Sequence, residues 1–225
     1  MLGAAEWHRK GLEVPGLKGL LHPRYGVFLP TRTEYVELLL KAPPPLGMRV
    51  FDVGTGTGVL SFVLLQRGAD RALGTDLDPR SVACAKENAE RLGLGGRFVA
   101  EERDLFPDGR ADLVVCNPPW IPEPPKNRVD RAVFDPGSAF LRAFLEGLGA
   151  HLSPGGEGWL LLSNLAELLG LRPAAFLAER LAEAGLAVKW KKDTAAGHPR
   201  AYDRSDPLHA ARSAEVTTLY CLAVA

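Results

Sequence analysis

The sequence predicts an α/β protein built on a doubly wound, mostly parallel seven-stranded sheet that ends in a C-terminal antiparallel ribbon. Three observations support this prediction. The first five apolar, strand-like segments alternate with helical patterns between residues 48 and 163. The first of these strands leads into a glycine-rich turn at residues 54–58, directly before a helix. The last two apolar segments, 186–192 and 216–224, have no helical pattern between them, so we expect them to pair antiparallel.

The expected helices carry recognisable start and stop signals. Pro43 ends the first helix, and Asp78 is placed to cap the third, whose first position is Pro79. Gly93 follows the end of this same helix and Gly185 follows the end of the fifth, positions where a left-handed residue commonly stops a helix. In chain order, the expected helices span residues 33–41, 59–66, 80–92, 138–151 and 173–184.

The expected strands are short apolar runs rich in β-branched residues. They span residues 48–53, 71–75, 97–100, 111–116, 158–163, 186–192 and 216–224. Residues 1–30 are rich in glycine and proline and are expected to be irregular, and the proline-rich segment 121–137 is expected to be a surface loop.

Composition and charge argue against several kinds of site and partner. The 27 basic and 27 acidic residues leave no net charge, which argues against an extended phosphate-binding surface but not against a local one. The three cysteines are isolated in apolar segments, so we expect no metal site. No apolar run approaches the ~20 residues that cross a bilayer, and the N-terminus lacks the pattern of a signal peptide. We therefore expect a cytoplasmic protein without membrane contact.

The glycine-rich turn is the first candidate site. Backbone that turns sharply and passes close to a ligand needs residues without a Cβ atom, which Gly54, Gly56 and Gly58 supply. The helix that follows would present its free N–H groups at the same place. The dinucleotide-binding fingerprint requires its third glycine one position later, where this chain has Val59.

Acidic residues after the next two strands extend this site. Asp76 follows strand 71–75, where a carboxylate can accept both hydroxyl groups of a ribose. Asp104 follows strand 97–100 and could accept from the amino group of an adenine, with Leu105 or Phe106 beside the ring. As a set, these positions fit one adenosine lying across the strand ends.

Residues 52–58 (Asp-Val-Gly-Thr-Gly-Thr-Gly), with Asp76, Asp104 and the motif Asn117-Pro118-Pro119-Trp120, resemble the class I S-adenosylmethionine-dependent methyltransferases. Within them they resemble the branch with an Asn-Pro-Pro-aromatic motif. That branch includes release-factor glutamine methyltransferases, adenine amino-methyltransferases of DNA and guanine methyltransferases of ribosomal RNA. The resemblance covers about residues 26–165, and the segment from Val27 to Tyr35 is similar to the glutamine-modifying members.

The resemblance implies a Rossmann-like methyltransferase fold, with S-adenosyl-L-methionine as the cofactor and S-adenosyl-L-homocysteine as its product. Residues 46–225 would form the S-adenosylmethionine-binding domain, and residues 1–45 an N-terminal arm and helix that contribute to the site. No metal is implied. The cofactor-binding residues that it implies are Asp52, Gly54, Thr55, Gly56, Gly58, Asp76, Leu77, Asp104, Leu105 and Asn117.

The Asn-Pro-Pro-Trp motif indicates catalysis on a planar –NH2 group, with Asn117, Pro118 and Trp120 as the catalytic residues. The nitrogen of an amide or aromatic amine is a poor nucleophile because its lone pair is delocalised. The side-chain oxygen of Asn117 and the carbonyl of Pro118 could accept its two N–H protons and favour the charge that develops on it. The prolines stiffen the turn, and Trp120 offers a flat face for stacking.

Three functions remain compatible with the sequence. Neutral charge and the segment around Pro30–Tyr35 favour methylation of a glutamine side-chain amide in a translation protein. Trp120 as a stacking platform favours a guanine or adenine amine of ribosomal or transfer RNA. A binding module without transfer activity is the third. Only 49 residues precede Val50, so we expect substrate recognition from residues 1–30, 121–137 and 193–214, the last of which contains two arginines beside Tyr202.

Overall fold

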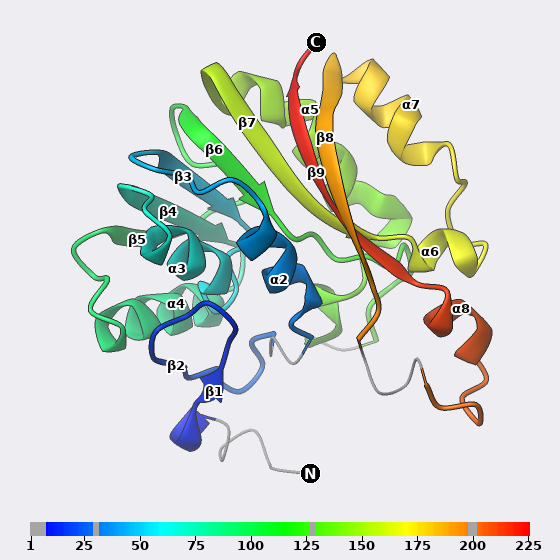
Figure 1. Ribbon diagram of the computed structural model, residues 1–225, viewed down its shortest axis with the longest axis horizontal. Coiled ribbons are helices and arrows are strands. Elements are labelled where there is room, and N and C mark those ends of the chain that lie inside the picture. Colours follow the sequence, from blue (N-terminus) through cyan, green and yellow to red (C-terminus); the bar gives the residue numbers. More distant parts are fainter. Residues whose placement is uncertain (1–7, 29–31, 127–128, 198–201) are drawn as a thin grey trace.

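The computed structural model describes residues 8–28, 32–126, 129–197 and 202–225 (Figure 1). Its centre is a seven-stranded sheet with the order β5-β4-β3-β6-β7-β9-β8. The pairs among β5, β4, β3, β6 and β7 are parallel, and β9 pairs antiparallel with both β7 and β8. The doubly wound sheet with its antiparallel ribbon is therefore confirmed.

The chain enters the sheet at its middle and winds first to one edge and then to the other. The strands of the sheet are β3 (Arg49–Val53), β4 (Arg71–Asp76), β5 (Phe98–Glu102), β6 (Ala111–Cys116), β7 (Leu152–Ser163), β8 (Leu186–Ala195) and β9 (Val216–Val224). Winding reverses between β3 and β6, and ligands of such sheets bind outside the carboxyl ends of the strands at that switch point.

Helices cover both faces of the sheet. The α-helices are α2 (Glu34–Lys41), α3 (Val59–Gln66), α4 (Pro79–Arg91), α5 (Ala139–His151), α6 (Leu165–Leu168), α7 (Phe176–Glu183) and α8 (His209–Ser213). Helices α2, α3 and α4 lie on one face of the sheet, and α5 and α7 lie on the other (Figure 1). Their buried side chains form one core with the sheet on each face. No helix in the described ranges is long and apolar enough to cross a bilayer.

The N-terminal region is more ordered than its glycines and prolines suggested. A small antiparallel hairpin pairs β1 (Leu12–Glu13) with β2 (Leu20–Leu21); Lys18 in its turn bonds to Gln66 of α3, and the residues after it bond to α4. The backbone N–H of His22 donates to Oδ1 of Asn88 at 2.9 Å, and Arg24 forms an ion pair with Glu87. The irregular arm expected at residues 1–30 is thus wrong for the part from residue 12 to residue 21.

Segment 121–137 lies largely at the surface, as its prolines indicated, but it is more structured than an irregular loop. It contains two 3₁₀ helices, η1 (Val129–Ala132) and η2 (Pro136–Ser138), and Ile121 is paired with Phe134. Asp135 is buried because its carboxylate accepts the backbone N–H groups of Phe140 and Leu141 at 2.9 and 3.1 Å. The segment is therefore folded back onto the first turn of α5, which the local sequence pattern does not reveal.

Several element bounds also differ from those expected. β7 begins at Leu152 rather than at residue 158, β8 continues to Ala195, and α7 begins at Phe176. The short helix α8 lies between β8 and β9, where no helix was expected. The two strands still pair antiparallel along nearly their whole length, because this short helix lies within the connection and does not cross the sheet.

Candidate active site at the carboxyl ends of the strands

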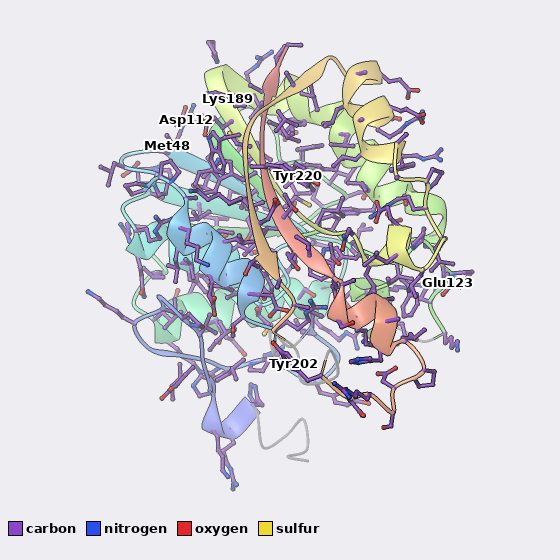
Figure 2. All side chains as sticks on the ribbon, turned by 45° about the vertical axis from the view of Figure 1, so that its right-hand side comes forward. Met48, Asp112, Glu123, Lys189, Tyr202 and Tyr220 are labelled. Carbon is purple, nitrogen blue, oxygen red and sulfur yellow. The ribbon has the colours of Figure 1, made fainter. Side chains whose placement is uncertain are left out.

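A cavity of about 280 Å³ opens at the carboxyl ends of β3, β4 and β6, at the switch point of the sheet. Met48 and Asp112, at the amino ends of β3 and β6, mark the opposite end of the sheet in Figure 2. The residues lining the cavity come from six stretches: Gly26, Phe28 and Tyr35; Gly54–Thr57, Val59 and Leu60; Asp76–Pro79 and Ser81; Arg103 and Leu105; Asn117 and Pro119; and Arg131, Ala132 and Phe140.

The glycine turn forms one wall of this cavity. Gly54, Gly56 and Gly58 all have positive φ values, of 75°, 55° and 86°. The backbone N–H groups of Gly54 and Thr55 donate to the carbonyl of Thr75 at 2.9 and 2.8 Å, which ties the turn to β4. A Cβ atom on Gly56 would meet nothing within 4 Å, whereas one on Gly58 would lie 2.3 Å from the ring of Phe62. Gly58 is therefore required for packing, and Gly56 leaves open space at the wall.

Asp52 lies beneath the glycine turn rather than at the cavity surface. Its Oδ2 accepts the hydroxyl groups of Thr55 and Ser61 at 2.8 and 2.7 Å, so the carboxylate holds the turn against α3. The residue is fully buried, and Oδ1 has no hydrogen-bond partner within the described part of the chain. Burial raises the pKa of this carboxyl group to about 6, although the bonds to Ser61 and Thr55 oppose that shift.

Asp76 presents its carboxylate to the cavity from the end of β4. Oδ2 accepts the backbone N–H of Gly56 at 3.0 Å, and Oδ1 accepts that of Asp78 at 2.9 Å. Burial raises the pKa of Asp76, and these backbone bonds oppose the rise. Each oxygen retains capacity for a further donor such as a hydroxyl group. Asp78 caps α4 as the sequence predicted, accepting from the backbone N–H of Arg80.

The residues after β5 divide between the cavity and the core. Leu105 lines the cavity with a φ of 55°, which is unusual for a residue with a branched side chain, and its carbonyl accepts the hydroxyl of Thr75. Asp104 is exposed and does not line the cavity, although Arg103 beside it does. Phe106 is buried against Phe144 in the core on the α5 face. Leu77 lies at the rim, where 64% of it is exposed.

The Asn-Pro-Pro-Trp motif follows β6 directly and turns at the cavity. Asn117 and Pro119 line it, whereas Pro118 is buried. The indole Nε1–H of Trp120 donates to Oδ1 of Asn117 at 3.0 Å. The guanidinium of Arg32 lies over the Trp120 ring, with Cζ 5.0 Å from its centre. Trp120 therefore differs from the open stacking face that the sequence suggested, since it does not line the cavity and one of its faces is covered.

Other cavity residues were not named individually from the sequence, although residues 1–45 were expected to contribute to the site. Gly26, Phe28 and Tyr35 come from the N-terminal arm and α2, and Arg131 and Phe140 from the segment after the motif. Tyr202, labelled in Figure 2, lies in the β8–α8 connection and is 73% exposed; the neighbouring residues 198–201 lie outside the described residues. Leu29–Thr31, within the segment similar to glutamine-modifying enzymes, also lie outside them.

The lining suits a nucleoside that carries a polar chain. Asp76 offers a carboxylate beside open space at Gly56, and the apolar side chains of Leu77 and Leu105 lie near it. This set of a carboxylate, a wall of bare backbone and apolar flanks fits S-adenosylmethionine. Asn117 adds an amide oxygen of fixed orientation to the same cavity.

Comparisons with known proteins agree with this chemistry. A family model for ribosomal protein L11 methyltransferase (PrmA) matches residues 36–118. A protein of Methanocaldococcus jannaschii, provisionally named a protein N5-glutamine methyltransferase, is 31% identical over 180 residues, covering 75% of this chain and 89% of that protein. The release factor glutamine methyltransferase of Cereibacter sphaeroides is 38% identical over 123 residues, covering 48% of this chain and 44% of its own length.

The solved structures show the same fold. The ribosomal protein L11 methylase of Lactobacillus delbrueckii subsp. bulgaricus superposes with a TM-score of 0.60 at 20% identity, covering 90% of this chain and 84% of that one. The chain therefore belongs to the class I S-adenosylmethionine-dependent methyltransferases, in the family that includes the protein N5-glutamine methyltransferases.

Proposed function

We propose that this methyltransferase transfers the methyl group of S-adenosylmethionine to the side-chain amide nitrogen of a glutamine in a protein of the translation apparatus. The observation that carries the proposal is that the glycine turn, Asp76 and the amide oxygen of Asn117 share one cavity. The relative from Methanocaldococcus jannaschii, which matches along 89% of its length, supports glutamine as the acceptor.

In this proposal the cofactor lies along the glycine turn. Asp76 accepts the ribose hydroxyl groups, Leu77 and Leu105 flank the adenine, and Gly54, Thr55 and Gly56 supply the backbone against the methionine chain. Asp52 and Gly58 hold the turn in shape from beneath it and from the α3 side. When bound, the cofactor supplies an electrophilic methyl group on a sulfonium centre. Asp104 is exposed, so its proposed contact with the adenine amino group receives no support from the lining of the cavity.

The acceptor nitrogen is proposed to lie at Asn117. Its Oδ1 already accepts the indole N–H of Trp120, and an amide oxygen has a second lone pair for an N–H of the substrate. The Pro118 carbonyl is proposed to accept the other N–H. Two acceptors on one stiff turn increase the electron density on the nitrogen and stabilise the positive charge that it gains. Residues 1–45 are proposed to contribute to substrate binding, since Gly26, Phe28 and Tyr35 reach the cavity.

The alternative is a base amine of ribosomal or transfer RNA. Both groups are planar and carry two N–H donors, so Asn117 and Pro118 do not distinguish them. The balance of 27 basic and 27 acidic residues favours a protein acceptor, since nucleic-acid binding usually needs a basic surface. The guanidinium over Trp120 also leaves less of its ring for a base.

The acceptor can be identified by isotope transfer. The purified protein is incubated with S-adenosylmethionine carrying a labelled methyl group, in separate reactions with total protein and total RNA from a deletion strain of the source organism. Mass spectrometry of the digests should find the label as N5-methylglutamine in a translation protein. Label only in a methylated nucleoside would establish the RNA alternative. Label on oxygen, sulfur or carbon would contradict both.

A further inference from the structure

The motif that faces the cavity is braced by a residue distant in sequence. Arg32 precedes α2 and lies between Trp120, after β6, and Glu215, before β9. We propose that Arg32 is a positioning residue, which holds the indole of Trp120 and, through it, the carboxamide of Asn117 in the orientation needed for N-methyl transfer. The inference rests on the proposed acceptor role of Asn117.

The first step is the way in which Arg32 itself is held. Its Nε donates to Glu34 at 2.8 Å and its Nη2 donates to Glu215 at 3.0 Å. Glu215 is only 2% exposed and also accepts the hydroxyl of Ser163, at the end of β7, at 2.6 Å. Carboxylates thus occupy the edge of the guanidinium and fix its plane, which leaves the flat face for another contact. The side chain of Arg32 is 19% exposed, so solvent screens its interactions only in part.

The second step is the contact between Arg32 and Trp120. With Cζ 5.0 Å from the ring centre, the guanidinium lies within the range of a cation–π interaction, and tryptophan is the strongest partner for one. The same contact covers one face of the indole. Trp120 is also packed against the core on the α5 face. These contacts restrain the ring from two sides, which is unnecessary for a ring that only stacks on substrate.

The third step leads from Trp120 to Asn117. An indole N–H can only donate, so its partner at 3.0 Å must be the amide oxygen of Asn117, which settles which way this carboxamide points. A freely rotating asparagine would present its NH2 group to the substrate as often as its oxygen, and an NH2 group cannot accept an N–H. Fixing the indole therefore fixes the acceptor.

The ion pairs of Arg32 also connect α2 to the start of β9, so a purely structural role for Arg32 is the alternative explanation. Loss of that connection would lower stability without changing the orientation of Asn117 in molecules that remain folded. The two explanations differ in one observable, the protection of the Trp120 Nε1–H from hydrogen exchange in the folded protein.

The test uses Arg32→Lys, which keeps a cation for Glu34 and Glu215 but lacks the planar group, and Arg32→Met, which lacks both. Indole N–H exchange is followed by NMR of ¹⁵N-labelled protein without substrate, and Trp120→Phe assigns the signal by removing it. The Nε1–H of Trp159, which donates to Glu157 elsewhere, is the internal reference. Arg142→Met is the matched control, since Arg142 lies over the ring of Phe176 at 5.5 Å and does not line the cavity.

In Arg32→Lys we expect Trp120 to exchange about 5- to 30-fold faster, the equivalent of a partly desolvated cation–π contact, while Trp159 is unchanged. Turnover at saturating cofactor should fall by a similar factor, with the affinity for S-adenosylhomocysteine within about threefold because the cofactor side is untouched. Arg32→Met should show the same changes if it folds, and Arg142→Met should show neither.

Unchanged Trp120 exchange in folded Arg32→Lys would overturn the proposal, as would faster exchange with unchanged turnover. Exchange of the Trp120 Nε1–H is measured without substrate, so it tests the contact from Arg32 independently of the proposed glutamine methylation. If Trp120 exchanges faster but the wild-type protein makes no N5-methylglutamine, the glutamine assignment fails and the contact from Arg32 to Trp120 stands. If N5-methylglutamine forms and exchange does not change, only the positioning role fails.

Discussion

The two sides of the cavity are built by different means. The glycine side is made of backbone: Gly54, Thr55 and Gly56 are held by hydrogen bonds to Thr75 and Asp76, all within 25 residues of the chain. The acceptor side, named for the proposed role of Asn117, is made of side chains. Trp120 donates to Asn117, Arg32 lies over Trp120, and Arg32 donates to Glu215, 183 positions away in the chain.

This difference indicates how the two sides should respond to change. Short-range backbone hydrogen bonds form whenever the sheet forms. The shape of the glycine side should therefore depend mainly on backbone conformation and on packing. A chain of side-chain contacts can be interrupted at any member without unfolding the protein. Substitutions on the acceptor side should therefore change turnover more than cofactor binding, and those on the glycine side should do the reverse.

The largest effect is expected on the acceptor side. Asn117→Ala should lower the turnover number by about 10²- to 10³-fold, the range for losing one group that stabilises developing charge. Affinity for S-adenosylhomocysteine by calorimetry should stay within a few-fold. Asn164→Ala is the control, since that side chain accepts a backbone N–H of β9 away from the cavity. A parallel decline of binding and turnover would make Asn117 a structural residue.

The next effect concerns the carboxylate beneath the glycine turn. The pKa of Asp52 is raised from 3.8 to about 6 by burial, so the folded state binds this proton more tightly than the unfolded state. The resulting stability is fully present below pH 4 and is lost as the pH rises through 6, by on the order of 3 kcal/mol. Denaturant unfolding at pH 4–7 should show this loss in the wild-type protein and not in Asp52→Asn. Equal pH slopes would contradict it.

On the same side, Asp76→Ala should weaken binding of S-adenosylhomocysteine by about 1.5–3 kcal/mol, the loss of hydrogen bonds to a charged group. Turnover at saturating cofactor should change less. Asp112→Ala, at the opposite end of the sheet, should leave the affinity unchanged. Wild-type affinity in folded Asp76→Ala protein would remove the ribose assignment.

The smallest expected effect is on stability, and it separates the cost of overpacking at Gly58 from the cost of backbone strain. Gly58 and Gly47 both have positive φ values, but only at Gly58 would a Cβ atom overlap another side chain. Replacing either by alanine costs backbone strain, and Gly58→Ala should lower the free energy of unfolding by about 1–3 kcal/mol more because of overpacking against Phe62. Equal losses in denaturant unfolding would show that the ring moves away freely.

The residues of the glycine side could be predicted from sequence because they are consecutive or directly follow successive strands. Gly54–Gly58 and Asp76 occur at fixed positions relative to β3 and β4, and parallel strands place their carboxyl ends together. What sequence missed there is conformational: the positive φ of Leu105, and the burial beneath the turn of Asp52, which the resemblance implied as a cofactor-binding residue.

On the acceptor side, only the Asn-Pro-Pro-Trp motif could be predicted from sequence. Asn117 to Trp120 could be recognised, but Arg32 and Glu215 show no pattern until β9 is known to lie beside β7 and α2 against both β8 and β9. Prolines in segment 121–137 indicated a loop correctly in kind, but they carry no information on the capping of α5 by Asp135. Contacts between side chains distant in sequence are set by packing, not by local propensity.

We propose that one cavity holds the cofactor on its glycine side and the acceptor nitrogen at Asn117. A crystal structure with S-adenosylhomocysteine tests it most directly. We expect the ribose hydroxyl groups within hydrogen-bonding distance of the Asp76 carboxylate, the sulfur atom directed toward Asn117, and the bond from Trp120 to Asn117 intact. A nucleoside bound elsewhere, or bound here with its sulfur directed away from Asn117, would contradict the account.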